Sequence, residues 1–385
     1  MSINVALMIV LFNMTAFRAS RVAITLFAVE LGVPQLFIGS LVAMYSVFPM
    51  LLGVYAGKLT DRLGVRAPLI GGTAGVGVGL LVPWLFPGIA ALYVSASLIG
   101  ASWVFYNVCV QNLIGMLSDA ESRARNFSNF GLAMAGGSFF GSLAAGFSID
   151  HFGHARSYLN LALIPLVSAL VLATTRLIPA GFGKDEGTEE QAIYSANLLN
   201  NKPLRRTLIT SAIVLTGTDL FQFYMPIYGR SVGLSASVIG IILGVFAVAA
   251  FVVRLVLPRM VRRFSADSIL VWSMFIGGAA YLVFPVFQHA LLLAAITFAL
   301  GLGLGCSQPV SLMLIYDRAP PGRSGEALGM RVTLNNFMHI TIPLFFGAIG
   351  TFFGGAAPVF LANAAIMTVG GVLSHRAAPK PAPKA

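Results

Sequence analysis

Two residues of opposite charge lie inside long apolar runs of the sequence. Arg18 is near the middle of the run 5–30, and Asp219 is near the middle of the run 206–231. A charge at the centre of a bilayer costs roughly 2.5–3.5 kcal/mol on insertion scales, so such residues usually serve function. An arginine there can hold an anionic or carbonyl group, and a carboxylate can carry a proton. The alternative is a structural ion pair between the two runs, and the sequence leaves both interpretations open.

Further polar residues fall on the same apolar segments. Arg21 and Gln222 follow the two charges by three residues, so each shares a helical face with one of them. Arg254 and Arg331 lie close enough to the ends of their segments to extend towards water instead, and His339 is equally compatible with a packing role. The candidate solute-binding residues are Arg18, Arg21, Tyr106, Asn107, Gln111, Gln222, Arg254, Gln308 and Arg331, and the candidate proton carriers are Asp219 and His339.

The composition predicts an all-α polytopic membrane protein. The 385 residues are 57% hydrophobic and only 10% charged, and the mean hydropathy is +0.87. A soluble domain carries about 25% charged residues, so this chain lacks the charge to cover a water-facing surface. Apolar runs long enough to cross a bilayer as helices recur throughout. Twelve spans are expected, at 5–30, 36–57, 67–87, 89–117, 127–149, 157–179, 206–231, 235–257, 268–288, 291–316, 325–350 and 355–374.

These spans divide into two six-helix bundles. The expected domains are residues 1–180 and 206–375, joined by a polar cytoplasmic linker at 181–205 and followed by a disordered tail at 376–385. The first span has no basic region before it and no small-residue cleavage site after it, so it is expected to be retained rather than removed as a signal peptide.

The positions of the basic residues predict the orientation. The net charge is +11, and twenty of the 24 Lys and Arg residues fall in or beside loops on one side of the predicted spans. Basic loops remain in the cytoplasm, so both termini are expected there, in a multi-pass protein of the inner membrane. The basic residues form no stripe with interleaved aromatics, which argues against a nucleic-acid partner.

The two predicted bundles are related by an internal repeat with an offset of 201 residues. The segment 31–39 aligns without gaps to 232–240, and 58–62 aligns to 259–263. The same register places Arg18 on Asp219, Arg21 on Gln222 and Asn107 on Gln308. A duplicated pair of bundles usually binds its solute near the bilayer midplane, between the halves. We therefore expect Arg18 and Asp219 to face each other across a central cavity.

The loop after the second span carries a recognisable motif. It reads Gly57-Lys-Leu-Thr-Asp61-Arg62-Leu-Gly64-Val-Arg66, which closely resembles the signature between the second and third helices of the major facilitator superfamily. The resemblance implies twelve helices, solute transport by alternating access, and a cytoplasmic latch formed by Gly57, Asp61, Arg62, Gly64 and Arg66. Val65 stands at a usually basic position. In the second half Arg262 replaces Asp61, so no equivalent latch is expected there.

The resemblance and the charges together predict a secondary transporter. Two to four arginines, Arg18 and Arg21 with Arg254 and Arg331 as further candidates, against one carboxylate favour a small organic anion as substrate, with a coupling proton in symport. The alternative is a broad exporter of drugs or sugars. The glycine-rich segment 131–141 resembles the fifth-helix motif of exporters, but Ser138 stands where that motif has proline, so export gains little support. Neither a phosphate-binding loop nor a converging catalytic set is present in the sequence, so no enzyme activity, cofactor or metal is expected, and the bilayer and the solute are the expected partners of a monomer.

Overall fold

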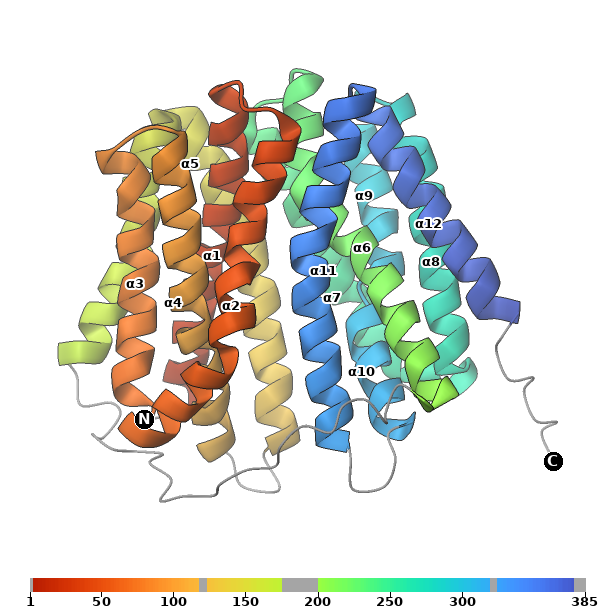
Figure 1. Ribbon diagram of the computed structural model, residues 1–385, viewed down its shortest axis with the longest axis horizontal. Coiled ribbons are helices and arrows are strands. Elements are labelled where there is room, and N and C mark those ends of the chain that lie inside the picture. Colours follow the sequence, from red (N-terminus) through yellow and green to blue (C-terminus); the bar gives the residue numbers. More distant parts are fainter. Residues whose placement is uncertain (1–2, 118–122, 175–199, 319–323, 377–385) are drawn as a thin grey trace.

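The computed structural model describes residues 3–117, 123–174, 200–318 and 324–376, and within these ranges the regular elements are all helices. They are α1 (Ile3–Glu30), α2 (Gln35–Leu63), α3 (Arg66–Leu85), α4 (Ile89–Met116), α5 (Arg123–Thr174), α6 (Lys202–Ser231), α7 (Ala236–Arg263), α8 (Ala266–Val283), η2 (Phe284–Val286), α9 (Ala290–Leu304), α10 (Ser307–Arg318), α11 (Ser324–Phe353) and α12 (Ala357–Arg376). The helices run roughly side by side, and both termini lie at the same end of the molecule (Figure 1).

Eleven helical segments of the described chain are long and apolar enough to cross a membrane. One of them, in α5, is 46 residues long and contains a non-helical residue, Gly153, with φ 75° and ψ 170°. The chain turns back at Gly153. The side chain of Asn160 shows this, since it donates to the hydroxyl of Ser148 (3.3 Å) across the turn. Helices α9 and α10 together form one crossing segment, Ala290–Ile315. The chain is therefore a polytopic membrane protein.

The predicted spans agree closely with these helices, and the differences are at their ends. Helix α2 continues six residues beyond the expected end, to Leu63, and α7 continues to Arg263. Helix α6 begins at Lys202, where the side chain of Asn201 accepts from the N–H of Leu204 (3.2 Å) and so caps the helix inside the expected linker. Helix α12 includes Arg376, so the first residue of the expected disordered tail is helical. Residues 175–199 and 377–385 of the linker and tail lie outside the described residues.

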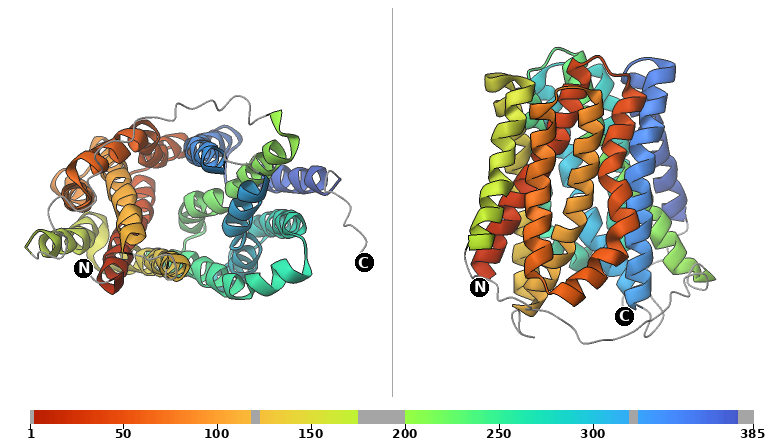
Figure 2. Two further views of the ribbon diagram at one scale, coloured as in Figure 1. Left: turned by 90° about the horizontal axis from the view of Figure 1, so that it is seen from below. Right: turned by 60° about the vertical axis from the view of Figure 1, so that its left-hand side comes forward.

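The two bundles, α1–α5 and α6–α12, lie side by side (Figures 1 and 2). Helix α2 packs along α11 and α5 packs along α7 to join them. Apart from one contact at mid-height, the hydrogen bonds between bundles that the structure describes lie at the end away from the termini. There Tyr224 donates to Gln35 (2.6 Å) and Arg230 pairs with Glu30 (3.0 Å). We call this end, with its turns near 31–34, 150–154, 232–235 and 354–356, the closed end.

The break between α9 and α10 has an identifiable cause. The carbonyl of Gly305 would normally accept from the N–H four residues on, but that residue is Pro309, which has none. The guanidinium of Arg254 on α7 donates to this carbonyl instead (3.0 Å). Helix α7 can come this close because a Cβ on Gly305 would lie only 2.4 Å from the Cα of Ala250. A backbone carbonyl in hydrocarbon needs a donor from the protein, and Arg254 supplies it.

This arrangement makes Arg254→Met a destabilising substitution whose cost depends on Pro309. Leaving a buried carbonyl without a donor costs about 1–3 kcal/mol, so the melting temperature in detergent should fall. Pro309→Ala restores a backbone N–H, and R254M should cost clearly less in that background. Arg259→Met, at an exposed position of the same helix, is the matched control. An equal cost of R254M in both backgrounds would show that Arg254 does not stand in for the missing donor.

Candidate functional site

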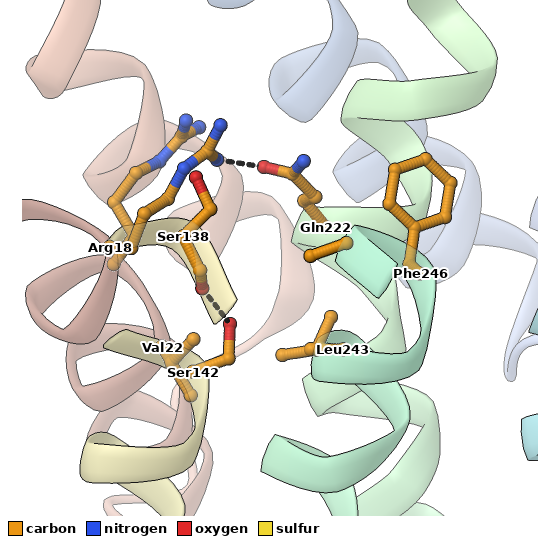
Figure 3. Close-up of a pocket in the computed structure, with 9 residues that line it drawn as sticks. Arg18, Val22, Ser138, Ser142, Gln222, Leu243 and Phe246 are labelled. Carbon is orange, nitrogen blue, oxygen red and sulfur yellow. Dashed lines mark hydrogen bonds between the residues drawn. The ribbon is translucent and has the colours of Figure 1, made fainter. Parts of the chain in front are cut away.

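A pocket lies between the bundles, on the four helices α1, α5, α6 and α7. It is lined by Arg18, Arg21, Val22, Ser138, Ser142, Gln222, Leu243, Phe246 and Ala247, and the free space of about 440 Å³ around these residues includes space open to solvent. Figure 3 shows the polar side chains of α1 and α5 facing Gln222 of α6, with Leu243 and Phe246 of α7 completing the opposite wall. The pocket therefore has a cationic side from the first bundle and a mostly apolar side from the second.

Arg18 reaches across this pocket from one bundle to the other. Its terminal nitrogen Nη1 donates to the side-chain oxygen of Gln222, while its Nε has no hydrogen-bond partner among the described residues. Arg21, one turn further along α1, lies with its guanidinium 5.9 Å from the ring centre of Tyr45. None of the ion pairs between described residues involves either arginine. The pocket thus presents two guanidinium groups with donors to spare.

Small residues of α5 set the position of Arg18. A Cβ on Gly141 would lie 2.5 Å from the carbonyl oxygen of Thr15 and 2.8 Å from the Cβ of Arg18. A Cβ on Gly137 would likewise lie 2.6 Å from that of Met14. Gly137 and Gly141 therefore allow close packing of α5 against α1.

Asp219 lies next to this cationic region but bonds within its own bundle. Its oxygen Oδ2 contacts Nδ1 of His339 on α11, and the Asp219 residue is only 8% exposed. An ionised carboxylate can only accept, so in that state Nδ1 of His339 carries the proton. The charges of Arg21 and Arg18 also act on Asp219, that of Arg21 more strongly. Two candidate proton carriers from different helices are thus joined directly, beside the pocket.

The expected face-to-face pair of Arg18 and Asp219 is not what the structure contains. Arg18 bonds to Gln222, and the repeat offset of 201 maps this contact onto one between Arg21 and Asp219. Residues that are equivalent in a two-fold repeat meet only where they lie on the axis. Arg18 therefore bonds to Gln222 across the pocket, whereas Asp219 bonds to His339 within its own bundle.

Other predicted residues have separate partners. Gln308 accepts from Arg331, whose Nη2 also lies 3.4 Å from the hydroxyl of Ser311, so these form a second polar cluster between α10 and α11. Tyr106 is fully buried within the first bundle and donates to the carbonyl of Ile9 (3.3 Å), away from the pocket lining. Asn107 is half-buried and Gln111 is exposed on α4. Arg254 holds the Gly305 carbonyl described above.

Part of the predicted latch can be described. Gly64 has a φ of 76°, which glycine adopts without strain and which ends α2. Arg66 donates to the carbonyl of Ala173 (3.3 Å) at the end of α5, a favourable position for a cation near a helix C-terminus. The side chains of Asp61 and Arg62 and the surroundings of Gly57 lie outside the described residues.

The structure adds residues that the sequence analysis did not select. Ser138 and Ser142 of α5 line the pocket, together with Leu243, Phe246 and Ala247 of α7. The two serines are four residues apart, so they share one helical face, and this spacing within the glycine-rich segment is the sequence signal for a polar face on this helix. The α7 residues are ordinary apolar residues of a span, and nothing in their types distinguishes them.

The fold and this site define a membrane carrier with its pocket between two duplicated bundles, and comparison identifies its family. The Major Facilitator Superfamily matches residues 6–343 and, in a second match, 207–385, so the chain belongs to that superfamily and is one of its transporters. Among curated relatives, the multidrug efflux pump LfrA of Mycolicibacterium smegmatis is 23% identical over 76% of this chain and 69% of its own. The multidrug resistance protein MdtG of Escherichia fergusonii is 22% identical over 91% of this chain and 88% of its own.

Solved structures share the fold at low sequence identity. The nucleoside transporter NupG has a TM-score of 0.79 and 14% identity, covering 97% of this chain and 99% of its own. A POT family transporter in complex with 5-aminolevulinic acid has a TM-score of 0.78 and 13% identity, covering 96% and 94%. A bacterial homologue of the lysosomal transporter Spinster, in an inward-facing conformation, has a TM-score of 0.77 and 14% identity, covering 98% of both chains.

The packing of α5 on α1 makes opposite predictions for two glycines of one helix. Gly131→Ala enters open space and should stabilise the helix by about 0.5–1 kcal/mol, because alanine restricts the unfolded chain. Gly141→Ala places a Cβ against the Thr15 carbonyl and should destabilise by about 1–3 kcal/mol while displacing Arg18. Thermal unfolding in detergent measures both. A Gly141→Ala variant as stable as Gly131→Ala would contradict the close contact that positions Arg18.

Proposed function

We propose that this protein is a secondary active transporter that moves a small organic anion together with a proton by alternating access of its two bundles. Counting α5 as two spans and α9 with α10 as one gives twelve, with both termini cytoplasmic. Support for this topology comes from the termini lying at one end (Figure 1), from the turn at Gly153 and from the basic residues of the loops. Under this topology the closed end faces outward and the pocket opens towards the cytoplasm.

The observation that carries the anionic substrate is the pair of guanidinium groups at the pocket. Arg18 and Arg21 both line it, and the only side chain that Arg18 bonds is the neutral Gln222 among the residues described. A buried cation without a counter-ion is costly. A carboxylate or similar group bound between the two arginines would offset their charge and could accept hydrogen bonds from both guanidinium groups. The hydroxyls of Ser138 and Ser142 donate to backbone carbonyls of α5, so they offer acceptors to donor groups in the rest of such a solute.

The coupling proton is assigned to Asp219 and His339. An anion bound at Arg18 and Arg21 adds negative charge close to Asp219 and offsets the positive charge of the two arginines. Binding of the anion therefore favours protonation of Asp219, and protonation in turn favours the anion, because linkage is reciprocal. Coupling of this sign is symport. The bond from Asp219 to His339 joins α6 to α11, so the same proton also changes the contact between two helices of the second bundle.

The second candidate function is export of lipophilic compounds. The observation that favours it is the description of the relatives LfrA and MdtG, named as a multidrug efflux pump and a multidrug resistance protein. A cationic or neutral drug would bind without neutralising Arg18 and Arg21, and protonation of Asp219 would oppose a cation. Export would thus run as proton antiport, so the sign of the coupling separates the two functions.

We further infer that the chain works in the inner membrane as a monomeric carrier rather than an enzyme, with no cofactor. The titratable side chains at the site, Asp219 and His339, are bonded to each other, an arrangement suited to holding and releasing one proton. Within the residues that the structure describes, no cluster of His, Cys, Asp or Glu is suited to a metal ion.

Replacement of Arg18 tests the anion site. Purified protein in liposomes is screened with labelled mono- and dicarboxylates, and the transported anion is then tested for binding. Arg18→Gln should weaken its binding about 10-fold or more, the loss expected for a hydrogen bond between charged groups. Arg18→Lys should have an affinity between those of the wild type and Arg18→Gln, because lysine keeps the positive charge but lacks the planar guanidinium with its several donors. Arg259→Gln, at an exposed position of α7, controls for net charge. Unchanged anion binding in Arg18→Gln would remove the central assignment.

Replacement of Asp219 tests the coupling. Asp219→Asn cannot bind or release a proton, so accumulation driven by a pH gradient should fall to the level without a gradient. Exchange of labelled for unlabelled substrate needs no net proton movement and should persist. Asp267→Asn is the control, since that carboxylate pairs with Arg318 within one bundle and away from the pocket. Full proton-driven accumulation by Asp219→Asn would show that another group carries the proton.

A further inference from the structure

The closed end contains a second copy of part of the latch motif. Residues Gly57, Asp61 and Gly64 have the same spacing as Gly146, Asp150 and Gly153. The backbone agrees as well as the spacing, since φ and ψ are 76° and 171° at Gly64 and 75° and 170° at Gly153. The first copy ends α2, and the second ends the first half of α5, at the opposite end of the molecule (Figure 1).

The second copy attaches α5 to the other bundle. The carboxylate of Asp150 accepts from the backbone N–H of Ala236 (3.0 Å) and of Ser237 (2.7 Å), the first two residues of α7. A Cβ on Gly146 would lie 2.4 Å from the carbonyl oxygen of Ala236, so glycine is what lets the two helices touch. Each residue of the motif thus has one role. Gly146 allows α5 to approach α7, Asp150 caps the N-terminus of α7, and Gly153 forms the turn within α5.

The repeat offset of 201 leads to a third copy on the other side of the closed end. It maps the motif onto Gly347, Thr351 and Gly354, and Gly354 has a φ of 69°. A Cβ on Gly347 would lie 2.8 Å from the carbonyl oxygen of Gln35, which is the repeat equivalent of Ala236.

The capping contact is repeated there in a weaker form. The hydroxyl of Thr351 accepts from the N–H of Leu36 (3.0 Å), as Asp150 accepts from Ser237, and Leu36 and Ser237 are again equivalent. The two contacts are one interaction related by the two-fold axis, made once with a carboxylate and once with a hydroxyl.

The fourth position of the series has lost the motif. There the sequence has Pro258, Arg262 and Ser265, with neither the glycines nor an acceptor. The motif therefore occurs in three of the four places that a chain built of three-helix units provides, and only the two copies in the first bundle carry aspartate. A carboxylate at a helix N-terminus binds more strongly than a hydroxyl, because it adds charge to the hydrogen bond and faces the positive end of the helix dipole.

We propose that Asp150 is the principal latch of the closed end, with Thr351 as its weaker counterpart, and that their contacts with α7 and α2 must separate before the pocket can open at that end. This proposal rests on the alternating access proposed above. The ion pair of Glu30 with Arg230 (3.0 Å), with His154 3.8 Å from Glu30, lies at the same end and assists closure. The Asp150 contact differs from it in holding the backbone of α7, a helix that lines the pocket.

Two substitutions taken from the chain's own repeat test the latch in opposite directions. Asp150→Thr makes the strong copy resemble the weak one, and Thr351→Asp does the reverse at an exposed position. Spin labels are attached at Phe86 and Val286 for the closed end, and at Leu63 and Phe264 for the other; all four are exposed, whereas both native cysteines are buried. The distance between the two labels of each pair is measured by double electron–electron resonance in lipid nanodiscs, without substrate.

Asp150→Thr should lower the ratio of closed to open molecules at this end about 5- to 30-fold. The distance between labels at 86 and 286 should lengthen, and that between labels at 63 and 264 should shorten. Thr351→Asp should shift both distances the other way. Gly146→Ala should open the closed end as Asp150→Thr does, because its Cβ meets the Ala236 carbonyl. Asp267→Asn, which breaks an ion pair within one bundle, should leave both distances unchanged.

Unchanged distances in folded Asp150→Thr, judged by melting temperature and gel filtration, would overturn the proposal, and so would opening caused by Thr351→Asp. Shifted distances in a protein that transports no anion would uphold the latch and reject the proposed substrate. If each label pair gave one distance that stayed the same in every variant, both the latch and alternating access would be overturned.

Discussion

Inside a bilayer, a polar group that leaves water must find its partner within the protein, and the rest of this structure follows from that requirement. It explains why the described chain is helical and why polar side chains inside the spans come in pairs. Arg254 holds the carbonyl that Pro309 leaves without a donor, Arg331 holds Gln308, and Asp219 holds His339. Arg18 and Arg331 follow it only in part, because their side-chain partners are neutral and the Nε of each has no partner in the described chain. Of these two arginines, Arg18 lines the pocket.

The duplication of the chain arranges these contacts in related pairs. The packing of Gly146 on Ala236 recurs as that of Gly347 on Gln35, and the contact of Asp150 with Ser237 recurs as that of Thr351 with Leu36. A two-fold arrangement alone would give two equal halves. The substitutions that break it, arginines against an aspartate and an amide at the pocket and aspartate against threonine at the closed end, give the halves different duties. The first bundle supplies the two arginines of the pocket and the proposed carboxylate latch, and the second supplies the proposed proton carriers.

The pocket and the closed end are built on the same helices. On α5, Ser138 and Ser142 line the pocket and Asp150 lies about two turns beyond them. On α7, Leu243 and Phe246 line the pocket, and the helix begins at Ala236, whose N–H donates to Asp150. Packed helices move as rigid bodies rather than bending continuously. A change in the contact at the helix ends therefore moves the pocket walls, which provides a physical route between solute binding and closure.

Composition and the lengths of the apolar runs were sufficient to predict the helices, because a membrane span requires about 20 apolar residues wherever it occurs. The family was predicted from the resemblance of the loop motif at 57–66. The helix ends were predicted less well, since α6 starts inside the expected linker and α12 includes Arg376. The sequence also singled out Arg18, Arg21, Asp219, Gln222 and His339, because polar residues are rare in such runs. It could not decide which of them meet. Pairing depends on where the two-fold axis crosses α1 and α6, and on the glycine contacts that set the distance between helices. Only the tertiary structure shows that Arg18 bonds to Gln222 and Asp219 to His339, that Tyr106 and Arg254 have partners outside the pocket, and that Asp150 joins the bundles.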